Sequence, residues 1–140
     1  MKPAVNHLSV RVYYEDTDCG NVVYYANYLR YMERGRTELL RSMGFELADL
    51  HKQDTQFVVA EANVKYHSSA RYNDVLDVAT SITEHSSVTI TFRYEIADQR
   101  GVLCVSGDVK AACVDRNGKV KRIPKAIIDK LIQTREKPIS

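Results

Sequence analysis

Four strand-like segments follow one another between residues 57 and 114, and the connections between them are too short to hold a helix. They cover residues 57–66, 75–83, 88–96 and 102–114. The third alternates strictly, with apolar side chains at Val88, Ile90, Phe92, Tyr94 and Ile96, which is typical of a half-buried strand. Parallel neighbours need a crossover of about a dozen residues or more, so we expect these strands to be antiparallel.

A long segment with helical spacing precedes this sheet. From about Asn27 to Met43, apolar side chains recur three or four positions apart, and Gly44 follows as the expected C-terminal cap. Gly35 lies on the apolar stripe of this helix. Its missing side chain would let a sheet approach the helix backbone closely.

The remaining elements are shorter. We expect a strand at residues 8–14, a loop through residue 54 after the long helix, and a second, short helix that Pro124 opens. A curled antiparallel sheet against a single helix is an economical way to bury the apolar surfaces of both. The sequence therefore predicts one α+β domain over residues 1–140.

The composition narrows the functional class. Hydrophobic residues make up 44% and charged residues 27% of the chain, an ordinary globular balance. A net charge of +2, without a basic run interleaved with aromatic residues, argues against a nucleic-acid-binding protein. The absence of a signal-peptide core and of a membrane span predicts a cytoplasmic protein without membrane insertion. The three cysteines are widely spaced and odd in number, which predicts reduced thiols. The chain has neither the Cys/His spacing of a metal site nor a Gly-rich phosphate loop, so we expect no metal and no cofactor.

The stretch from Tyr14 to Tyr28 carries the most chemistry, because Asp16 and Asp18 directly precede the long helix. Amides at a helix N-terminus lack internal partners and, with the helix dipole, form an anion site. A carbonyl held there would be stabilised as negative charge develops, and a neighbouring carboxylate could attack it or activate water. Gly20 would leave room for a substrate beside the backbone. Carboxylates before a helix are also common caps and turn formers, so local chemistry alone leaves both interpretations open.

Longer motifs favour the catalytic interpretation. The sequence DTDCGNVVYYANYL at 16–29, followed by ERGRTELL at 33–40, resembles the signature of the 4-hydroxybenzoyl-CoA thioesterase-type hot-dog family. It is most similar to the Tol–Pal-associated (YbgC-like) acyl-CoA thioesterase branch of that family. The motifs VKYH at 64–67, ARYND at 70–74 and RIP at 122–124 extend the resemblance over nearly the whole chain.

The resemblance implies a hot-dog fold, in which a five-stranded antiparallel sheet wraps around one long central helix. It implies an acyl-CoA thioesterase that hydrolyses a thioester to free acid and coenzyme A. Asp18 would be its catalytic nucleophile or general base, and the backbone amide of Tyr25 its oxyanion donor. Chains would pair edge to edge as a homodimer or dimer of dimers (a homotetramer), with active sites at the dimer interface. Basic side chains would meet the phosphates of coenzyme A, with Lys65, Arg71 and Lys110 as candidates, and acyl carrier protein is a further candidate partner.

Four residues are expected to contact the substrate: Tyr14, Gly20, Asn27 and His67. Tyr14 keeps a phenol near the site, and His67 lies in the strand-end segment that borders the acyl channel in the family. Position 25 departs from much of the Tol–Pal-associated branch, because it is tyrosine instead of histidine, as in the aryl-CoA thioesterases. A backbone amide survives this change, whereas an imidazole acid or base does not, so the proton route and the acyl preference stay open.

Other side chains compete for a catalytic role. Glu33, Glu38 and Glu61 are weaker candidates, because surface ion pairs explain them as well. Cys19 has no histidine nearby in sequence to activate it, and Asp16 is expected to cap the turn or to raise the pKa of the second aspartate by repulsion. The alternative function is a binding module for acyl-CoA or acyl carrier protein with little turnover. A hot-dog dehydratase ranks lower, because the long helix contains no histidine.

Overall fold

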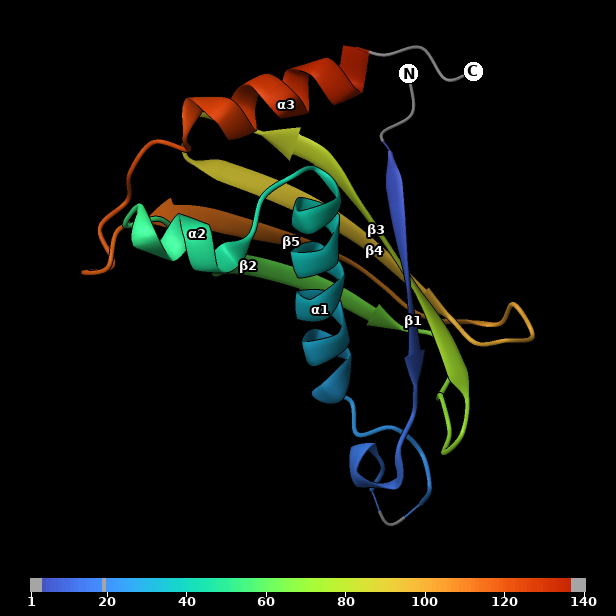
Figure 1. Ribbon diagram of the computed structural model, residues 1–140. Helices are drawn as coiled ribbons and strands as arrows, with labels where there is room; N and C mark the ends of the chain where they lie inside the picture. The colour runs from blue at the N-terminus through green and yellow to red at the C-terminus, as the bar shows by residue number, and fades with distance from the viewer. Residues whose placement is uncertain (1–3, 19, 137–140) are drawn as a thin grey trace.

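The computed structural model describes residues 4–18 and 20–136 and has the predicted order of one strand, one long helix, four strands and a final helix. Figure 1 shows the long helix crossing one face of the sheet. The elements are β1 (Val5–Arg11), the 3-10 helix η1 (Tyr14–Asp16), α1 (Asn27–Ser42), α2 (Leu47–Lys52), β2 (Gln56–Tyr66), β3 (Val75–His85), β4 (Thr89–Ala97), β5 (Leu103–Val114) and α3 (Lys125–Glu136).

The sheet is antiparallel throughout, in the order β1-β3-β4-β5-β2. Two of the three short connections form hairpins, which pair β3 with β4 and β4 with β5, and both pairs are antiparallel as the close spacing predicted. The connection from β2 to β3 forms no hairpin, because β2 pairs with β5 at the far edge of the sheet. Within the described chain β2 pairs only with β5, which leaves its other edge without a partner strand. Most side chains of β2 are exposed, including Val58 and Val59 at 44% and 52%.

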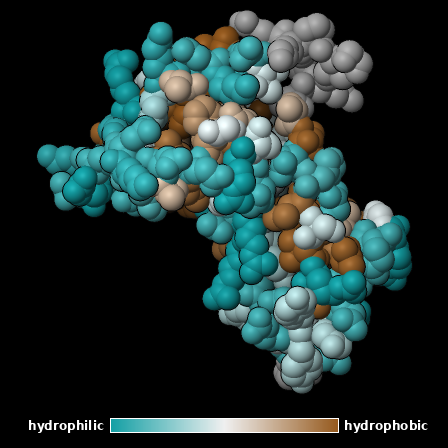
Figure 2. Space-filling model, in the orientation of Figure 1, coloured by the Kyte–Doolittle hydropathy of each residue, from teal (hydrophilic) through white to brown (hydrophobic). Residues whose placement is uncertain are grey.

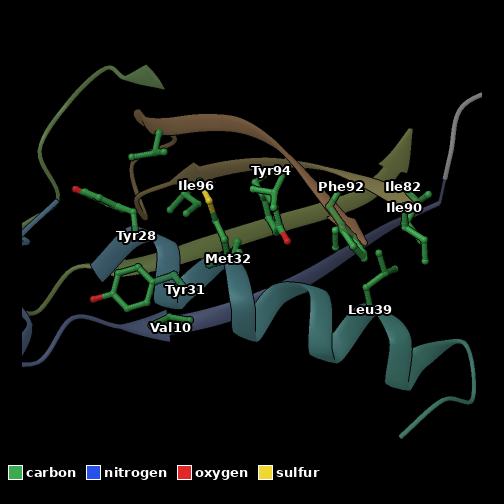
Figure 3. Packing of buried hydrophobic residues seen from close by; sticks show 14 of the residues in the cluster. Val10, Tyr28, Tyr31, Met32, Leu39, Ile82, Ile90, Phe92, Tyr94 and Ile96 are labelled. Atoms are coloured by element: carbon green, nitrogen blue, oxygen red, sulfur yellow. The ribbon is translucent and has the colours of Figure 1, made fainter. Parts of the chain in front are cut away.

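The core lies between α1 and the concave face of the sheet. Figure 3 shows Leu39 of α1 pointing toward Ile82 and Phe92, while Tyr31 and Met32 occupy the other end of the helix. At the crossing point Gly35 is buried, and a side chain there would overlap Thr80 of β3. The close approach that the sequence predicted at Gly35 is therefore confirmed.

Two segments differ from the prediction. The strand expected at 8–14 begins earlier, because Val5 already pairs with Ser81 of β3. It also ends earlier, because the backbone amide of Tyr13 donates to the Asp16 carboxylate at 2.8 Å and the chain turns into η1. The expected loop after α1 contains the short helix α2, whose buried Leu50 packs into the core. Six residues are too few for a helical period to stand out in a sequence, so this helix was missed.

Candidate active site

The loop between η1 and α1 is held in place by the segment that joins β2 to β3. The amide of Val23 donates to the carbonyl of Ala70 at 2.8 Å, and the amide of Ala70 donates to the phenol oxygen of Tyr28 at 3.0 Å. Burial raises the pKa of the Tyr28 phenol above its ordinary value, so this group stays neutral and accepts the bond. Val22 also forms a β-bridge with Arg71. The start of α1 is thus tied to residues far away in the sequence.

Asp16 organises the base of this loop. Its carboxylate caps η1, and its carbonyl accepts bonds from the amide of Tyr24 at 3.0 Å and from Nδ2 of Asn27 at 2.8 Å. The structure therefore gives Asp16 the capping role, which was one of its two expected roles. It also shows that the side-chain nitrogen of Asn27, a predicted substrate contact, holds the loop to the helix.

Asp18 lies at the tip of the same loop with an exposed side chain. Its Oδ1 accepts the amide of Gly20 at 2.9 Å, and its own amide donates to the carbonyl of Val22 at 3.0 Å. The first bond is an Asx-type turn, the structural role expected for an aspartate in such a loop. Oδ2 accepts no hydrogen bond from the residues that the structure describes, so one carboxylate oxygen is open to solvent or ligand.

Two backbone donors at the beginning of α1 have no acceptor among the described residues. The amides of residues 27–29 donate to the carbonyls of residues 24–26 at 2.8, 3.3 and 3.2 Å, in 3-10 fashion. The amides of Tyr25 and Ala26 donate to none of the described residues, and no side chain caps the helix. Free amides at a helix start favour an anion or a developing oxyanion. The amide of Ala26 was missed from the sequence, because which amides stay free depends on the geometry of the first turn.

Tyrosine rings surround this helix start. The ring of Tyr25 lies 4.9 Å from that of Tyr24 and 6.1 Å from that of Tyr66, and Tyr66 also lies 5.8 Å from Tyr28. Tyr24, Tyr25 and Tyr66 are all about half exposed. Tyr66 is at the end of β2 and was not singled out from the sequence, because only the folded chain brings that strand end to α1.

The other predicted contacts lie farther apart. Tyr14 is exposed and stands edge-on to Tyr72, with ring centroids 5.9 Å apart. His67 places Nε2 2.8 Å from the hydroxyl of Ser106 in β5. Because Tyr66 faces α1 and successive side chains of an extended chain alternate, His67 lies on the opposite, outer face of the sheet. The structure thus gathers Asp18, Gly20 and Tyr25 in one loop and sets His67 apart.

The competing candidates have ordinary surroundings. Glu38 pairs with Arg41 on the surface of α1, and Glu33 and Glu61 are exposed. Cys19 lies outside the described residues. Among the residues that are described, no group of three or more His, Cys, Asp or Glu side chains could hold a metal ion. Of the helices described, none has the length and apolar character needed to cross a bilayer.

Comparisons with known proteins agree with this architecture. The sequence model of the thioesterase-like superfamily matches residues 12–131. The acyl-CoA thioester hydrolase YbgC of Escherichia coli O6:H1 is 39% identical over 120 residues, which cover 85% of this chain and 90% of that protein. The acyl-CoA thioesterase YbgC of Haemophilus influenzae is 44% identical over 116 residues, 81% of this chain and 83% of its own.

A solved structure extends the likeness to three dimensions. The DHNA-CoA thioesterase from Staphylococcus aureus superposes with a TM-score of 0.87 at 25% identity, covering 97% of each chain. The family match begins directly after β1 and spans the candidate loop, the long helix and strands β2 to β5. Together with the antiparallel sheet wrapped around α1, these matches show that the chain belongs to the thioesterase-like superfamily and has its hot-dog fold.

Proposed function

We propose that this protein hydrolyses acyl-CoA thioesters to a free acid and coenzyme A. The observation that carries the proposal is the pairing, within one short loop, of an exposed carboxylate at Asp18 with two free helix-start amides at Tyr25 and Ala26. The activity named for the YbgC relatives supports the same reaction. The free amides would bind the thioester oxygen and stabilise it as the carbonyl carbon becomes tetrahedral.

The carboxylate has two chemically balanced routes. In one, an oxygen of Asp18 attacks the carbonyl carbon, the carbon–sulfur bond breaks, and coenzyme A leaves as a thiolate that takes a proton; water then cleaves the acyl-aspartyl anhydride. In the other, Asp18 accepts a proton from water, and that water attacks the carbonyl directly. Both routes consume one water and release acid and thiol. The Asx-type turn at Gly20 fixes Oδ1 and leaves Oδ2 for either task.

The free edge of β2 supports a dimer. An unpaired, largely exposed strand carrying Val58 and Val59 is a template for pairing with another strand. We expect two copies to join their β2 edges antiparallel, which would place the Tyr66 end of one strand beside the Gln56 end of the other. Further association of such dimers would give the dimer of dimers that the family resemblance implies.

A basic pocket supports the placement of coenzyme A. The β3–β4 hairpin and the segment before α3 enclose about 720 Å³, lined by Arg122 and Lys125, two serines, and His85, and by no carboxylate. His85 has a buried ring nitrogen, Nδ1, without a partner among the described residues. The side chains of Arg122 and Lys125 carry positive charges that suit the phosphates of coenzyme A. The residues named from sequence, Lys65, Arg71 and Lys110, do not line this pocket.

Distance within one chain favours a shared site. The 11 residues of β3 separate the hairpin from the loop end of the sheet, about 35 Å for an extended strand. Figure 1 shows the hairpin near α3 and the candidate loop at the opposite end. Antiparallel pairing of two β2 edges would bring the basic pocket of one chain toward the helix start of the other. This arrangement supports active sites at a dimer interface.

The test of the proposal is the Asp18→Asn variant, assayed by release of free thiol from a panel of short aliphatic, long aliphatic and aryl CoA thioesters. Asparagine keeps an oxygen that can accept the amide of Gly20, so the turn should persist. We expect turnover to fall at least ~10²-fold with the oligomer unchanged in size-exclusion chromatography. Glu33→Gln, an exposed carboxylate on α1, is the matched control and should keep full activity. Wild-type turnover in Asp18→Asn would refute the assignment.

A binding module is the second candidate, and the residue at position 25 favours it. The exposed side chain of Tyr25 supplies no imidazole for proton transfer beside the free amides. Calorimetry with a CoA thioester, run beside the thiol assay, separates the two functions. Tight binding without thiol release by the wild-type protein would favour the module.

We place this activity in the cytoplasm. Of the described cysteines, Cys104 and Cys113 are buried free thiols, which supports a reducing compartment.

A further inference from the structure

A second, largely apolar cavity lies at the end of the molecule farthest from the candidate loop. It encloses about 340 Å³ between the first residues of β1, the end of α1, β3 and α3. Figure 2 shows apolar atoms reaching the surface between α3 and the upper end of α1. Leu39, Met43, Ile82 and Leu131 supply most of its apolar wall. This volume is within the range of small-molecule sites and is well above that of a packing defect.

Two polar groups at this cavity have no partner among the residues that the structure describes. In β1, Leu8 and Val10 pack on the core side. Asn6 lies on the same face of the strand, at a position where an apolar residue is expected. Its Nδ2 is buried and bonds to no residue that the structure describes. Lys130 also lines the cavity, and none of the ion pairs found between described residues includes its ammonium group.

We propose that this cavity binds a medium-chain carboxylic acid. The alkyl chain would lie against the apolar wall, and the carboxylate would take hydrogen bonds from the Lys130 ammonium and the Asn6 amide. An engineered cavity of about 150 Å³ accommodates benzene, so twice that volume suits a chain of about eight to ten carbons. The site is separate from the Asp18 loop, so the acid would bind whether or not the chain hydrolyses thioesters.

Decanoate is the probe, and the readouts are calorimetry and the methyl NMR signals of Met43 and Ile82. Decanol has the same chain without the charge and isolates the contribution of the carboxylate. Lys130→Gln removes the cation from the cavity, and Lys119→Gln, an exposed lysine in a distant turn, is the matched control. Asn6→Leu removes the buried amide by a separate route and keeps the strand apolar on its core side. All of these variants leave Asp18 and the free amides intact.

We expect decanoate to bind one to one and to shift both methyl signals, with decanol at least tenfold weaker. Lys130→Gln and Asn6→Leu should each weaken decanoate at least fivefold, and Lys119→Gln should match the wild type. The proposal is overturned if neither methyl signal moves at millimolar decanoate. It is equally overturned if decanol binds as well as decanoate and neither variant changes the affinity, since the cavity would then not recognise a carboxylate. Loss of thioesterase activity in Asp18→Asn has no bearing on these outcomes.

Discussion

Replacing Gly35 by alanine tests how closely α1 rests on the sheet. A Cβ at this position would lie well inside van der Waals contact of the Thr80 hydroxyl, 3.0 Å from Cγ1 of Val78 and 3.6 Å from Cε1 of Tyr94. The Oγ1 of Thr80 has no partner among the described residues, so no hydrogen bond fixes the hydroxyl. The residue is nevertheless fully buried, so its side chain cannot move out into solvent. The added methyl group must therefore displace α1 or force Thr80 from its rotamer.

Two opposing effects set the magnitude. Overpacking a well-packed core costs about 1–3 kcal/mol, and this contact is at the severe end of that range. Alanine in a helix interior recovers about 1 kcal/mol relative to glycine. We therefore expect Gly35→Ala to lower the free energy of unfolding by about 1–2 kcal/mol. Without the clash, the same substitution would stabilise the protein.

Urea unfolding at a fixed protein concentration measures this change, because the concentration affects the stability of any oligomer. The Thr80→Ala background removes the nearest atom and leaves Val78 at 3.0 Å, so the cost of Gly35→Ala should fall there. Residues in direct contact couple by about 0.5 kcal/mol or more in such a double-mutant cycle. A Gly35→Ala protein as stable as the wild type, or strict additivity with Thr80→Ala, would refute the packing argument.

Three further substitutions test other parts of the structure. Tyr28→Phe removes the acceptor of the buried Ala70 amide, so we expect a loss of about 1–3 kcal/mol in urea unfolding and faster hydrogen exchange at Ala70; unchanged exchange there would contradict the bond. The hydrogen bond from Arg116 lowers the pKa of Asp54 in the folded protein. This pair therefore stabilises the fold at a pH above the pKa of the unfolded chain, and the stabilisation is lost as the pH falls through the lower pKa of the folded state. Asp54→Asn should therefore flatten the pH dependence of the urea midpoint below about pH 4, and an equally steep acid limb would exclude this contribution. Val59→Lys puts a charge on the free edge of β2 and should shift the protein toward monomer in analytical ultracentrifugation, whereas an unaltered sedimentation coefficient would count against pairing at this edge.

The parts of the fold that follow local periodicity could be predicted from the sequence. The alternation from Val88 to Ile96 and the helical stripe around Gly35 each report which face of one element is buried, and the structure confirms both. The hairpin turn at Asp98 is also local, since this carboxylate accepts the amides of Arg100 and Val102. The short helix α2 was missed because its stability depends on packing Leu50 into a distant core.

The candidate site divides in the same way. Asp18 and Tyr25 stand in one motif, so the sequence alone could select them, although their catalytic roles remain predictions. The free amide of Ala26 depends on how the first turn of α1 closes. The approach of Tyr66 to the helix start depends on contacts between segments some 40 residues apart in sequence, which no local pattern records.

The exposed second strand also constrains how the newly made protein stays in solution. Until another strand covers it, Val58 and Val59 offer backbone and apolar side chains to any extended segment, including that of a misfolded neighbour. Glu61 and Lys65 place opposite charges on the same exposed strand and disfavour its pairing with an unrelated segment. If two copies pair through β2 as proposed, this pairing must outpace aggregation, and the yield of native protein on refolding should depend on how quickly matching copies meet.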